Sequence, residues 1–454
     1  MSYEEFLLRK KHSSIDMGIE PILMNDMLFD FQNHIADYAI RKGRCACFVD
    51  TGLGKTLIEL IVAQNYVLST NKRVLIITPL AVAFQFITEA NKFGIDDVSY
   101  SRYGKLTSKI VICNYERLHL FNPNDYDCVI LDESSILKNY DGKIKEQITD
   151  FIKKTKYRFL FTATPSPNDF IELGTSSEAL GELGYVDMLT KFFVNNEDTI
   201  KPQNIGTKWR LKGHAEEAFF DWVRSWSISV RKPSDIGYSD ERHILPELIT
   251  NFIPVKNNDT LVINGQTSLF PIIARTQSEV RQEQKITTEQ RCEKAVEVAN
   301  NHDTSVYWCN LNYEGDLLTK LDKNAYQIKG SMSIEQKEEI LLAFANGDIK
   351  KLVTKAQMTA FGLNWQHCNH TIYFPTFSYE QYYQAIRRFY RFGQKNNVIC
   401  DMVHSEGQQR VLDSLIAKSH KADTLYTQLT KSSNQLKINK KETIKRNINL
   451  PKFI

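Results

Sequence analysis

A glycine-rich loop between an apolar run and a helix-like stretch is the first feature of this sequence that could do chemistry. The run CACFVD leads directly into TGLGKT at residues 51–56. Gly52 and Gly54 let the backbone approach phosphates, and the amides at the start of the following helix point at the anion. Lys55 would reach the β- and γ-phosphates, and the Thr56 hydroxyl would bind Mg²⁺. The pattern predicts a P-loop that binds ATP with magnesium.

Two adjacent carboxylates supply the acidic partner that a P-loop needs. The segment DCVILDES places Asp132 and Glu133 directly after an apolar run. Asp132 would hold the Mg²⁺ through water, and Glu133 would orient and deprotonate the attacking water. A carboxylate pair at a strand end could instead cap a helix. The presence of Lys55 and Thr56 in the same chain favours the catalytic interpretation.

An arginine-rich segment lies far along the chain. QAIRRFYRFGQ and the residues after it hold four arginine or lysine residues between positions 387 and 395. An arginine from a second lobe can stabilise charge on the γ-phosphate and so tie closure of a cleft to the state of the nucleotide. The alternative interpretation is a helix with a solvated basic face.

Two blocks of short apolar runs and amphipathic stretches must position these groups. TLIELIVAQNYVLS has helical spacing, and SIEQKEEILLAFANG is a helix that stops at Gly347. Short apolar strands separated by helices predict parallel sheets covered on both faces, and hence an α/β fold with two lobes in tandem. The strand candidates are residues 45–50, 73–78, 109–113, 127–132 and 157–162 in the first block, and 305–310, 350–354, 370–374 and 397–403 in the second.

Length and shifts in composition divide the 454 residues into four parts. We expect an ATP-binding lobe at 1–170, a helical insertion and interlobe linker at 171–290, a second lobe at 291–425 and a basic tail at 426–454. From Lys431 onwards the tail holds seven basic residues against one acidic residue. It is either a solvated tail or an accessory segment that contacts phosphates.

The predicted insertion is rich in aromatic residues. Phe219, Phe220, Trp222 and Trp226 recur at helical spacing. This spacing favours a buried core over an exposed wedge that stacks on bases.

Composition argues against several other classes of protein. No apolar stretch reaches the roughly 20 residues that span a bilayer, and the first residues do not form a signal peptide, so we expect a cytoplasmic protein. The eight cysteines form no CxxC pair, which predicts reduced, mostly buried thiols. HCNH at 367–370 has no second ligand cluster at zinc spacing, so we expect structural polar residues there.

The motifs, in their order along the chain, resemble those of superfamily-two helicases. Within that family they resemble the Swi/Snf-type translocases and the compact DEAD/DEAH-type helicases encoded by bacteriophages. The resemblance covers about residues 25–410. It implies two tandem RecA-like lobes with a helical insertion between them, ATP and Mg²⁺ as cofactors, and DNA as the partner.

In the first lobe, the resemblance assigns roles to residues outside the P-loop. LFDFQNHIADYAI resembles the segment that reads adenine, which makes Gln32 the expected adenine contact. TPLAVAFQFITEA, ICNYERL, LDESSILKN and FTATPSPN resemble the motifs that contact nucleic acid or couple hydrolysis to movement; their residues here are Pro79, Asn114, Tyr115, Lys138, Asn139, Thr162 and Thr164. Ser135 stands where the family usually has histidine.

In the second lobe, two segments resemble family motifs. TKAQMTAFGLNWQHC resembles the fifth motif, which implies nucleic-acid or coupling roles for Thr354 and Lys355 and a nucleotide contact for Gly362. QAIRRFYRFGQ resembles the final motif closely. Its alignment makes Arg388 and Arg391 the two arginines that face the nucleotide and leaves Arg387 outside the pattern.

The resemblance implies an ATP-dependent DNA translocase or helicase, a DNA-stimulated ATPase that acts on duplex or branched DNA as a monomer. Two alternatives remain, an RNA helicase and a non-hydrolysing nucleic-acid-binding scaffold of the same fold. The similarity to phage proteins implies a role in phage replication or recombination, and then a location in the host cytoplasm. Neither a protein partner nor the direction of movement follows from the sequence.

Overall fold

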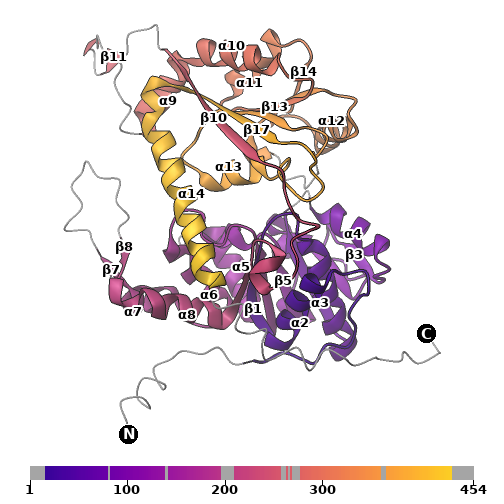
Figure 1. The fold of residues 1–454 in the computed structure, drawn as a ribbon. Coiled ribbons are helices and arrows are strands. Elements are labelled where there is room, and N and C mark those ends of the chain that lie inside the picture. Colours follow the sequence, from indigo (N-terminus) through magenta and orange to yellow (C-terminus); the bar gives the residue numbers. More distant parts are fainter. Residues whose placement is uncertain are drawn as a thin grey trace.

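The computed structural model describes residues 16–79, 82–138, 142–195, 209–256, 262–263, 266–267, 277–358 and 365–431. These residues form two α/β lobes, drawn one above the other in Figure 1, and each lobe is built around its own parallel sheet. This arrangement confirms the predicted fold class, two tandem RecA-like lobes.

The first lobe contains a seven-stranded sheet in which all neighbouring strands are parallel. In the five inner strands, alternate residues enter two hydrophobic clusters on opposite faces, as Cys47 and Phe48 do. This two-sided burial explains why the strands read as continuous apolar runs. Across the sheet the strands are β3 (Val98–Tyr100), β4 (Ile110–Asn114), β2 (Arg73–Thr78), β5 (Tyr126–Leu131), β6 (Tyr157–Thr162), β1 (Arg44–Val49) and β9 (Ser227–Val230).

Helices cover both faces of this sheet. One face packs against α2 (Asp30–Lys42), α3 (Lys55–Thr70) and α4 (Ala83–Lys92). The other packs against α5 (Lys143–Lys153), α6 (Leu173–Leu180), α7 (Tyr185–Phe192) and α8 (Glu216–Trp226).

The second lobe contains a six-stranded parallel sheet. Across it lie β10 (Leu248–Val255), β17 (Val398–Ser405), β16 (His370–Tyr373), β13 (Ser305–Trp308), β15 (Lys351–Thr354) and β14 (Ala325–Gln327). Its helices are α9 (Gln277–Ile286), α10 (Thr288–Ala299), α11 (Asn312–Leu321), α12 (Ile334–Asn346), α13 (Tyr379–Ile386) and α14 (Gln409–Thr430). Helix α12 ends at Gly347 with φ of 86°, as the sequence predicts.

Residues 171–290, expected to be a helical insertion and linker, are instead divided between the lobes. Helices α6, α7 and α8 are present, and a hairpin of β7 (Phe193–Asn195) and β8 (Trp209–Leu211) joins two of them. Strand β9 then extends the first sheet beside β1, whereas β10 forms the edge of the second sheet beside β17. A further short hairpin comprises β11 (Val262–Ile263) and β12 (Gln266–Thr267).

The aromatic residues of the insertion are core, as their spacing predicts. Phe219, Phe220, Trp222 and Trp226 of α8 are all buried and pack on the first sheet. Trp226 contacts Phe48 of β1 edge-to-face, with ring centroids 6.0 Å apart. These side chains therefore stabilise the first lobe and do not form an exposed wedge.

The C-terminal helix α14 crosses from the second lobe to the first (Figure 1). Leu412 and Leu415 pack in the core of the second lobe, whereas Leu425, Tyr426 and Leu429 pack in the core of the first. The expected boundary of the basic tail at residue 426 is therefore too early, because α14 continues to Thr430. The tail from residue 432 onwards lies outside the described residues.

Two expectations drawn from composition can also be compared with the structure. All eight cysteines are buried and free, which confirms the prediction of reduced thiols. Among the described residues, no helix combines the length and the apolar character that crossing a bilayer requires.

Candidate nucleotide site between the lobes

The P-loop lies between β1 and α3, where the sequence predicts it. Gly52 and Gly54 have φ of 84° and 80°, in the left-handed region that favours glycine. Helix α3 begins at Lys55, and the Lys55 Nζ donates a hydrogen bond to the carbonyl oxygen of Val49 at 3.0 Å. The lysine therefore folds back over its own loop, and its contact with phosphates stays a prediction.

Gln32 supports this loop from α2. The side chain is buried, and its Nε2 donates to the carbonyl oxygen of Leu53 at 2.9 Å. Its Oε1 accepts a hydrogen bond from the backbone nitrogen of Phe29 at 3.0 Å. The structure thus shows Gln32 bonded to the P-loop; its contact with adenine stays a prediction.

The acidic pair stands at the carboxyl end of β5, between β2 and β6. The hydroxyl of Thr78 donates to the Asp132 Oδ2 at 2.7 Å. Burial and the neighbouring Glu133 raise the pKa of Asp132 to about 6, although the Thr78 hydrogen bond lowers it. Glu133 has φ of 51°, unusual for a residue with a Cβ, and its Oε1 accepts from Thr162 at 2.8 Å and from Ser135 at 3.2 Å. Both carboxylates are held in fixed orientations by neighbouring strands.

These donors suit a magnesium ion. The Thr56 hydroxyl and the Asp132 carboxylate form an all-oxygen set, which Mg²⁺ prefers. The positive charge of Lys55 acts on the Asp132 carboxyl, so the P-loop and the acidic pair lie close enough to influence each other electrostatically. The residues predicted to hold Mg²⁺ are therefore compatible with it, and their roles stay predictions.

Glu59 is a residue of this region that sequence analysis missed. It lies on α3, one turn after Lys55, and is fully buried. Neither of its carboxylate oxygens has a hydrogen-bond partner among the described residues. Burial, followed by the charge of Asp132, raises the pKa of Glu59 well above its ordinary value. An acidic residue inside the apolar stretch TLIELIVA was the signal that could have identified it.

Two arginines of the second lobe face the P-loop. The Nε atoms of Arg388 and Arg391 are buried, and within the described chain they have no hydrogen-bond partner. Burial lowers the pKa of both side chains to about 10, and for Arg388 the positive charge of Arg391 adds to the effect. The backbone nitrogen of Phe392 lies 3.0 Å from the position that a Cβ on Gly52 would occupy. The segment carrying both guanidinium groups therefore touches the P-loop.

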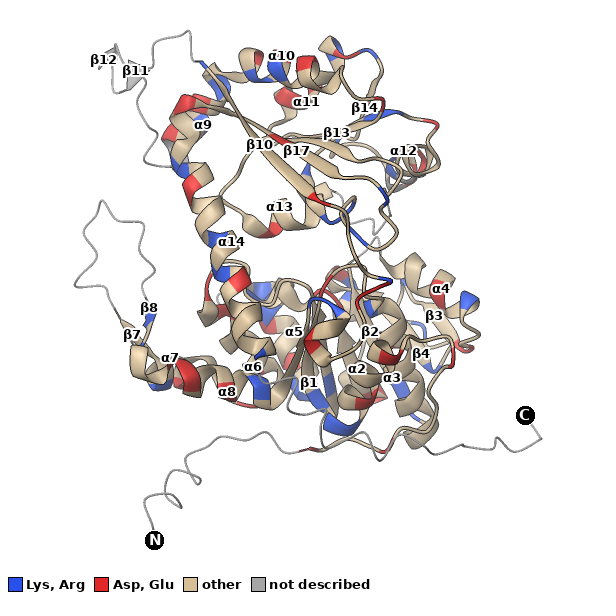
Figure 2. Ribbon diagram, viewed as in Figure 1, with Lys and Arg blue, Asp and Glu red and all other residues tan. Residues whose placement is uncertain are grey.

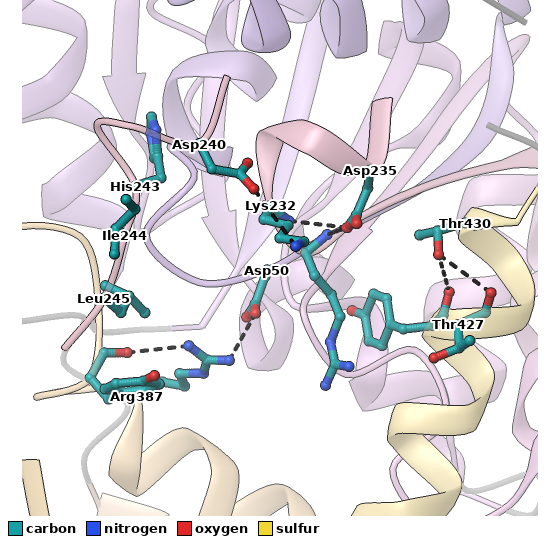
Figure 3. A pocket seen from close by; sticks show the side chains of 13 residues that line it. Asp50, Lys232, Asp235, Asp240, His243, Ile244, Leu245, Arg387, Thr427 and Thr430 are labelled. Carbon is teal, nitrogen blue, oxygen red and sulfur yellow. Dashed lines mark hydrogen bonds and ion pairs between the residues drawn. The ribbon is translucent and has the colours of Figure 1, made fainter. Parts of the chain in front are cut away.

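Arg387, which the resemblance leaves outside the motif, is paired across the lobes. Its Nη2 lies 2.9 Å from the Asp50 Oδ2 (Figure 3). The Tyr383 hydroxyl also donates to Asp50. Arg387 and Asp50 line a cavity of about 550 Å³ between the lobes. The signal for this pair was the first arginine of QAIRRFYRFGQ, which the family motif does not use, together with an acidic residue directly before TGLGKT.

The residues predicted to contact nucleic acid or to couple hydrolysis to movement do not form one cluster among the described residues. Pro79 is half-buried at the end of β2. Tyr115 is buried, and its hydroxyl donates to the backbone carbonyl of Asp132, so it lies behind the acidic pair. Lys138 forms an ion pair with Glu380 of the second lobe. Asn139 lies outside the described residues.

The remaining predicted residues are distributed over both lobes. Asn114 is fully buried at the end of β4. The backbone nitrogen of Thr164 donates to the Thr162 hydroxyl at 3.0 Å. In the second lobe Thr354 is buried, and the Lys355 Nζ donates to Asn312 at 2.7 Å. Gly362 is outside the described part of the chain.

Charge by itself does not identify a nucleic-acid face. Figure 2 shows basic and acidic residues interspersed on the helices of both lobes. The formal net charge is only +3.

The HCNH stretch belongs to a hydrogen-bond network. The His370 Nδ1 lies 2.7 Å from the Ser305 hydroxyl, and its Nε2 lies 2.9 Å from the Asp401 carboxylate. The ring of His302 stacks on that of His370 with centroids 3.6 Å apart. His302, His370 and Asp401 are close enough together to be considered as metal ligands. Both ring nitrogens of His370 are already engaged, by Ser305 and by Asp401.

Comparison with known proteins gives a separate family match for each lobe. A family model described as DEAD/DEAH box helicase matches residues 29–172, and the helicase conserved C-terminal domain matches residues 280–393. An uncharacterized ATP-dependent helicase of Bacillus subtilis, YqhH, is 22% identical over 465 residues, which cover 90% of this chain and 81% of the relative.

Two other similarities are more limited. The DNA annealing helicase and endonuclease ZRANB3 of Bos taurus is 26% identical over 179 residues, 35% of this chain and 16% of ZRANB3. The SWI2/SNF2 ATPase core of Sulfolobus solfataricus, solved with double-stranded DNA, covers 91% of this chain and 96% of its own with 19% identity and a TM-score of 0.43. With one helicase model matched to each lobe and the P-loop, acidic pair and arginine motif assembled between them, the chain belongs to the superfamily-two helicases.

Proposed function

We propose that the protein is a DNA-dependent ATPase that couples hydrolysis of Mg-ATP between its lobes to movement along duplex or branched DNA. The observation that carries this proposal is the pair Arg388 and Arg391. Both are half-buried guanidinium groups whose Nε atoms lack partners among the described residues, and their segment touches the P-loop of the opposite lobe. An ATP γ-phosphate would satisfy them only when the lobes are closed.

The groups of the first lobe would divide the work of hydrolysis. Lys55 would neutralise charge on the phosphates, and Thr56 and Asp132 would hold Mg²⁺, which would offset charge on the phosphate oxygens. Glu133, oriented by Thr162, accepts the proton of the attacking water. Because Thr162 leads into the segment after β6, a change at Glu133 can reach that segment, as coupling to movement requires.

DNA is favoured over RNA as the track. The Lys-Asn pair after the acidic motif and the GLNWQ segment resemble Swi/Snf-type proteins, and ZRANB3 is described as a DNA annealing helicase. An RNA helicase is the second candidate, because the DEAD/DEAH box model that matches the first lobe does not distinguish the two nucleic acids.

Movement along the duplex is favoured over strand separation. The large aromatic residues of α8 are buried in the first lobe, so they are unavailable to insert between bases. We therefore expect displacement of a third strand, or migration of a branch, to be easier than unwinding of a long blunt duplex.

One set of assays tests the proposal. ATP turnover is measured with duplex DNA, branched DNA, single-stranded DNA and RNA, alongside triplex displacement, branch migration and forked-duplex unwinding. We expect duplex or branched DNA to stimulate turnover at least as well as single strands. Stimulation by RNA alone would support the RNA helicase, and nucleotide binding without turnover on any nucleic acid would support a scaffold.

The resemblance to compact phage helicases leads us to propose a role in phage DNA replication or recombination. Infection with phage that carries an inactivated gene for this protein, followed by measurement of phage DNA synthesis and of recombinant yield, tests that role. Normal values of both would exclude it.

A further inference from the structure

One face of α13 bonds directly to the first lobe. Glu380 and Tyr383 are on the helix and Arg387 is its C-cap; they are spaced three and four residues apart, so they lie on one side. Glu380 pairs with Lys138, and both Tyr383 and Arg387 bond to Asp50. The two anchors are seven residues apart, about 10 Å along the helix. Helix α13 is therefore fastened to the first lobe near both of its ends.

Asp50 connects this helix to the P-loop. It follows β1 and precedes the loop, and its backbone nitrogen donates to Val230 of β9 at 2.9 Å. Its Oδ1 accepts a hydrogen bond from the backbone nitrogen of Thr51, the first residue of TGLGKT, at 2.6 Å. Tyr383 donates to the same oxygen, and Arg387 donates to the other. One carboxylate thus joins the first peptide of the P-loop to the second lobe.

Arg387 is the counter-ion that this carboxylate requires. Asp50 is 4% exposed, and a buried carboxylate without a cation is strongly unfavourable. The other basic residues of the cavity pair elsewhere, Arg231 with Asp423 and Lys232 with Asp240. Although burial alone lowers the pKa of Arg387, Asp50 and the nearby tyrosines raise it above its ordinary value. Arg387 therefore has its partner before any nucleotide arrives, in contrast to Arg388.

We propose that Arg387 is a positioning residue that acts from the second lobe on Asp50, and through it sets the start of the P-loop when the lobes close. The Lys138–Glu380 pair forms the second anchor of the same helix face, beside the acidic pair. This inference rests on the proposed ATPase function and adds a division of roles to it. Arg387 prepares the loop to bind ATP, whereas Arg388 and Arg391 act on the phosphates during turnover.

The two roles predict different kinetic effects. Loss of Arg387 leaves the Asp50 carboxylate uncompensated in the closed state, so closure and ATP binding weaken together. Because Arg387 is half-buried, its loss should cost less than the loss of one partner of a fully buried ion pair. We expect the KM for ATP to rise about tenfold or more, with kcat changed less than about threefold. Alanine at Arg388 should show the opposite pattern.

The test is a double-mutant cycle with Asp50→Asn, Arg387→Gln and the two combined, in the full chain with saturating duplex DNA. The combined variant should be no worse than the worse single variant, because both remove one interaction. Arg387→Lys keeps the charge and should recover part of the affinity for ATP. Arg281→Gln, at an exposed position on α9, is the matched control and should change neither constant.

A second readout does not depend on hydrolysis. Dyes attached through unnatural amino acids at the exposed positions Leu68 and Tyr326, one in each lobe, report the interlobe distance by energy transfer. Without nucleotide, Arg387→Gln should lower the transfer efficiency, and Arg281→Gln should not. Unchanged KM and unchanged transfer in Arg387→Gln, or strictly additive effects in the cycle, would overturn the inference. If even the wild-type protein fails to hydrolyse ATP, the proposed function fails while the transfer measurement still decides the role of Arg387.

Discussion

Removal of the two leucines that hold α14 on the first lobe should detach that end of the helix. Leu425 and Leu429 are each 1% exposed and lie in the core of the first lobe, although the helix begins on the second. A buried leucine replaced by alanine costs about 2–5 kcal/mol. Because the helix end can partly collapse into the space, we take about 2 kcal/mol for each residue and about 4 kcal/mol for Leu425→Ala/Leu429→Ala.

This cost exceeds what any single polar contact of the helix end can offset. The Tyr426 hydroxyl donates to the Ala163 carbonyl at 2.7 Å, and Arg224 donates to the Gln428 carbonyl at 2.7 Å. Each such hydrogen bond contributes about 1 kcal/mol net. The apolar contacts are therefore the main source of docking, and polar contacts alone should not keep the end of α14 in place.

Hydrogen exchange measures the effect directly. A loss of about 4 kcal/mol should speed exchange of the amides at 425–430 by about three orders of magnitude, while the β1 amides stay protected. Turnover on DNA should fall, because the lobes lose one of their connections. Ile416→Ala, on the same helix at a position 41% exposed, is the control and should alter protection by less than about 0.5 kcal/mol. Exchange at 425–430 that rises less than about threefold in the double variant would refute the docking argument.

Lys55→Ala should lower ATP turnover at least about 100-fold with little change in the melting temperature, since the hydrogen bond of its ammonium group is to its own loop, at Val49. Steady-state kinetics and calorimetry check this, and near-normal turnover would disprove the P-loop assignment. Glu133→Gln should bind Mg-ATP but hydrolyse it about 100-fold or more slowly than the unchanged protein. The variant should also bind DNA more tightly with ATP than with ADP. Equal DNA affinities with the two nucleotides would argue against coupling to the γ-phosphate. Alanine at Arg388 or Arg391 should lower kcat about 1000-fold with little change in ATP binding, so a variant that loses DNA binding but keeps turnover would contradict the assignment. Removal of residues 432–454 should weaken DNA binding. The slope of the logarithm of the binding constant against the logarithm of the salt concentration should become shallower by about 0.9 for each DNA phosphate that the tail neutralises. An unchanged slope would mean a solvated tail.

The sequence alone was sufficient to predict the local elements of the fold and of the nucleotide site. Strands β1, β2 and β5 read as apolar runs because both faces of a parallel sheet are covered, and the chemical groups follow them directly. TGLGKT, the acidic pair and the end of α12 at Gly347 each depend on residues a few positions apart. Local patterns of this kind are visible without knowledge of the fold.

Edge strands and long-range pairings were not visible in this way. Strand β10 contains Thr250 and Asn251 and lies at the edge of its sheet, partly exposed, so it lacks the apolar signature of a central strand. Strand β9 has only four residues and follows an aromatic helix, which made the region look helical throughout. The division of residues 171–290 between the lobes therefore required the sheets themselves.

Only the tertiary structure decided which arginine has which partner. In the sequence Arg387, Arg388 and Arg391 are three cations on one short segment, and resemblance alone separates them. In the folded chain Arg387 meets Asp50, 337 residues earlier, whereas the Nε atoms of Arg388 and Arg391 meet no described partner beside the P-loop. Charge pairing across two lobes depends on distances that the order of residues does not contain, so the folded arrangement was needed to distinguish a structural ion pair from the arginines proposed to bind a phosphate.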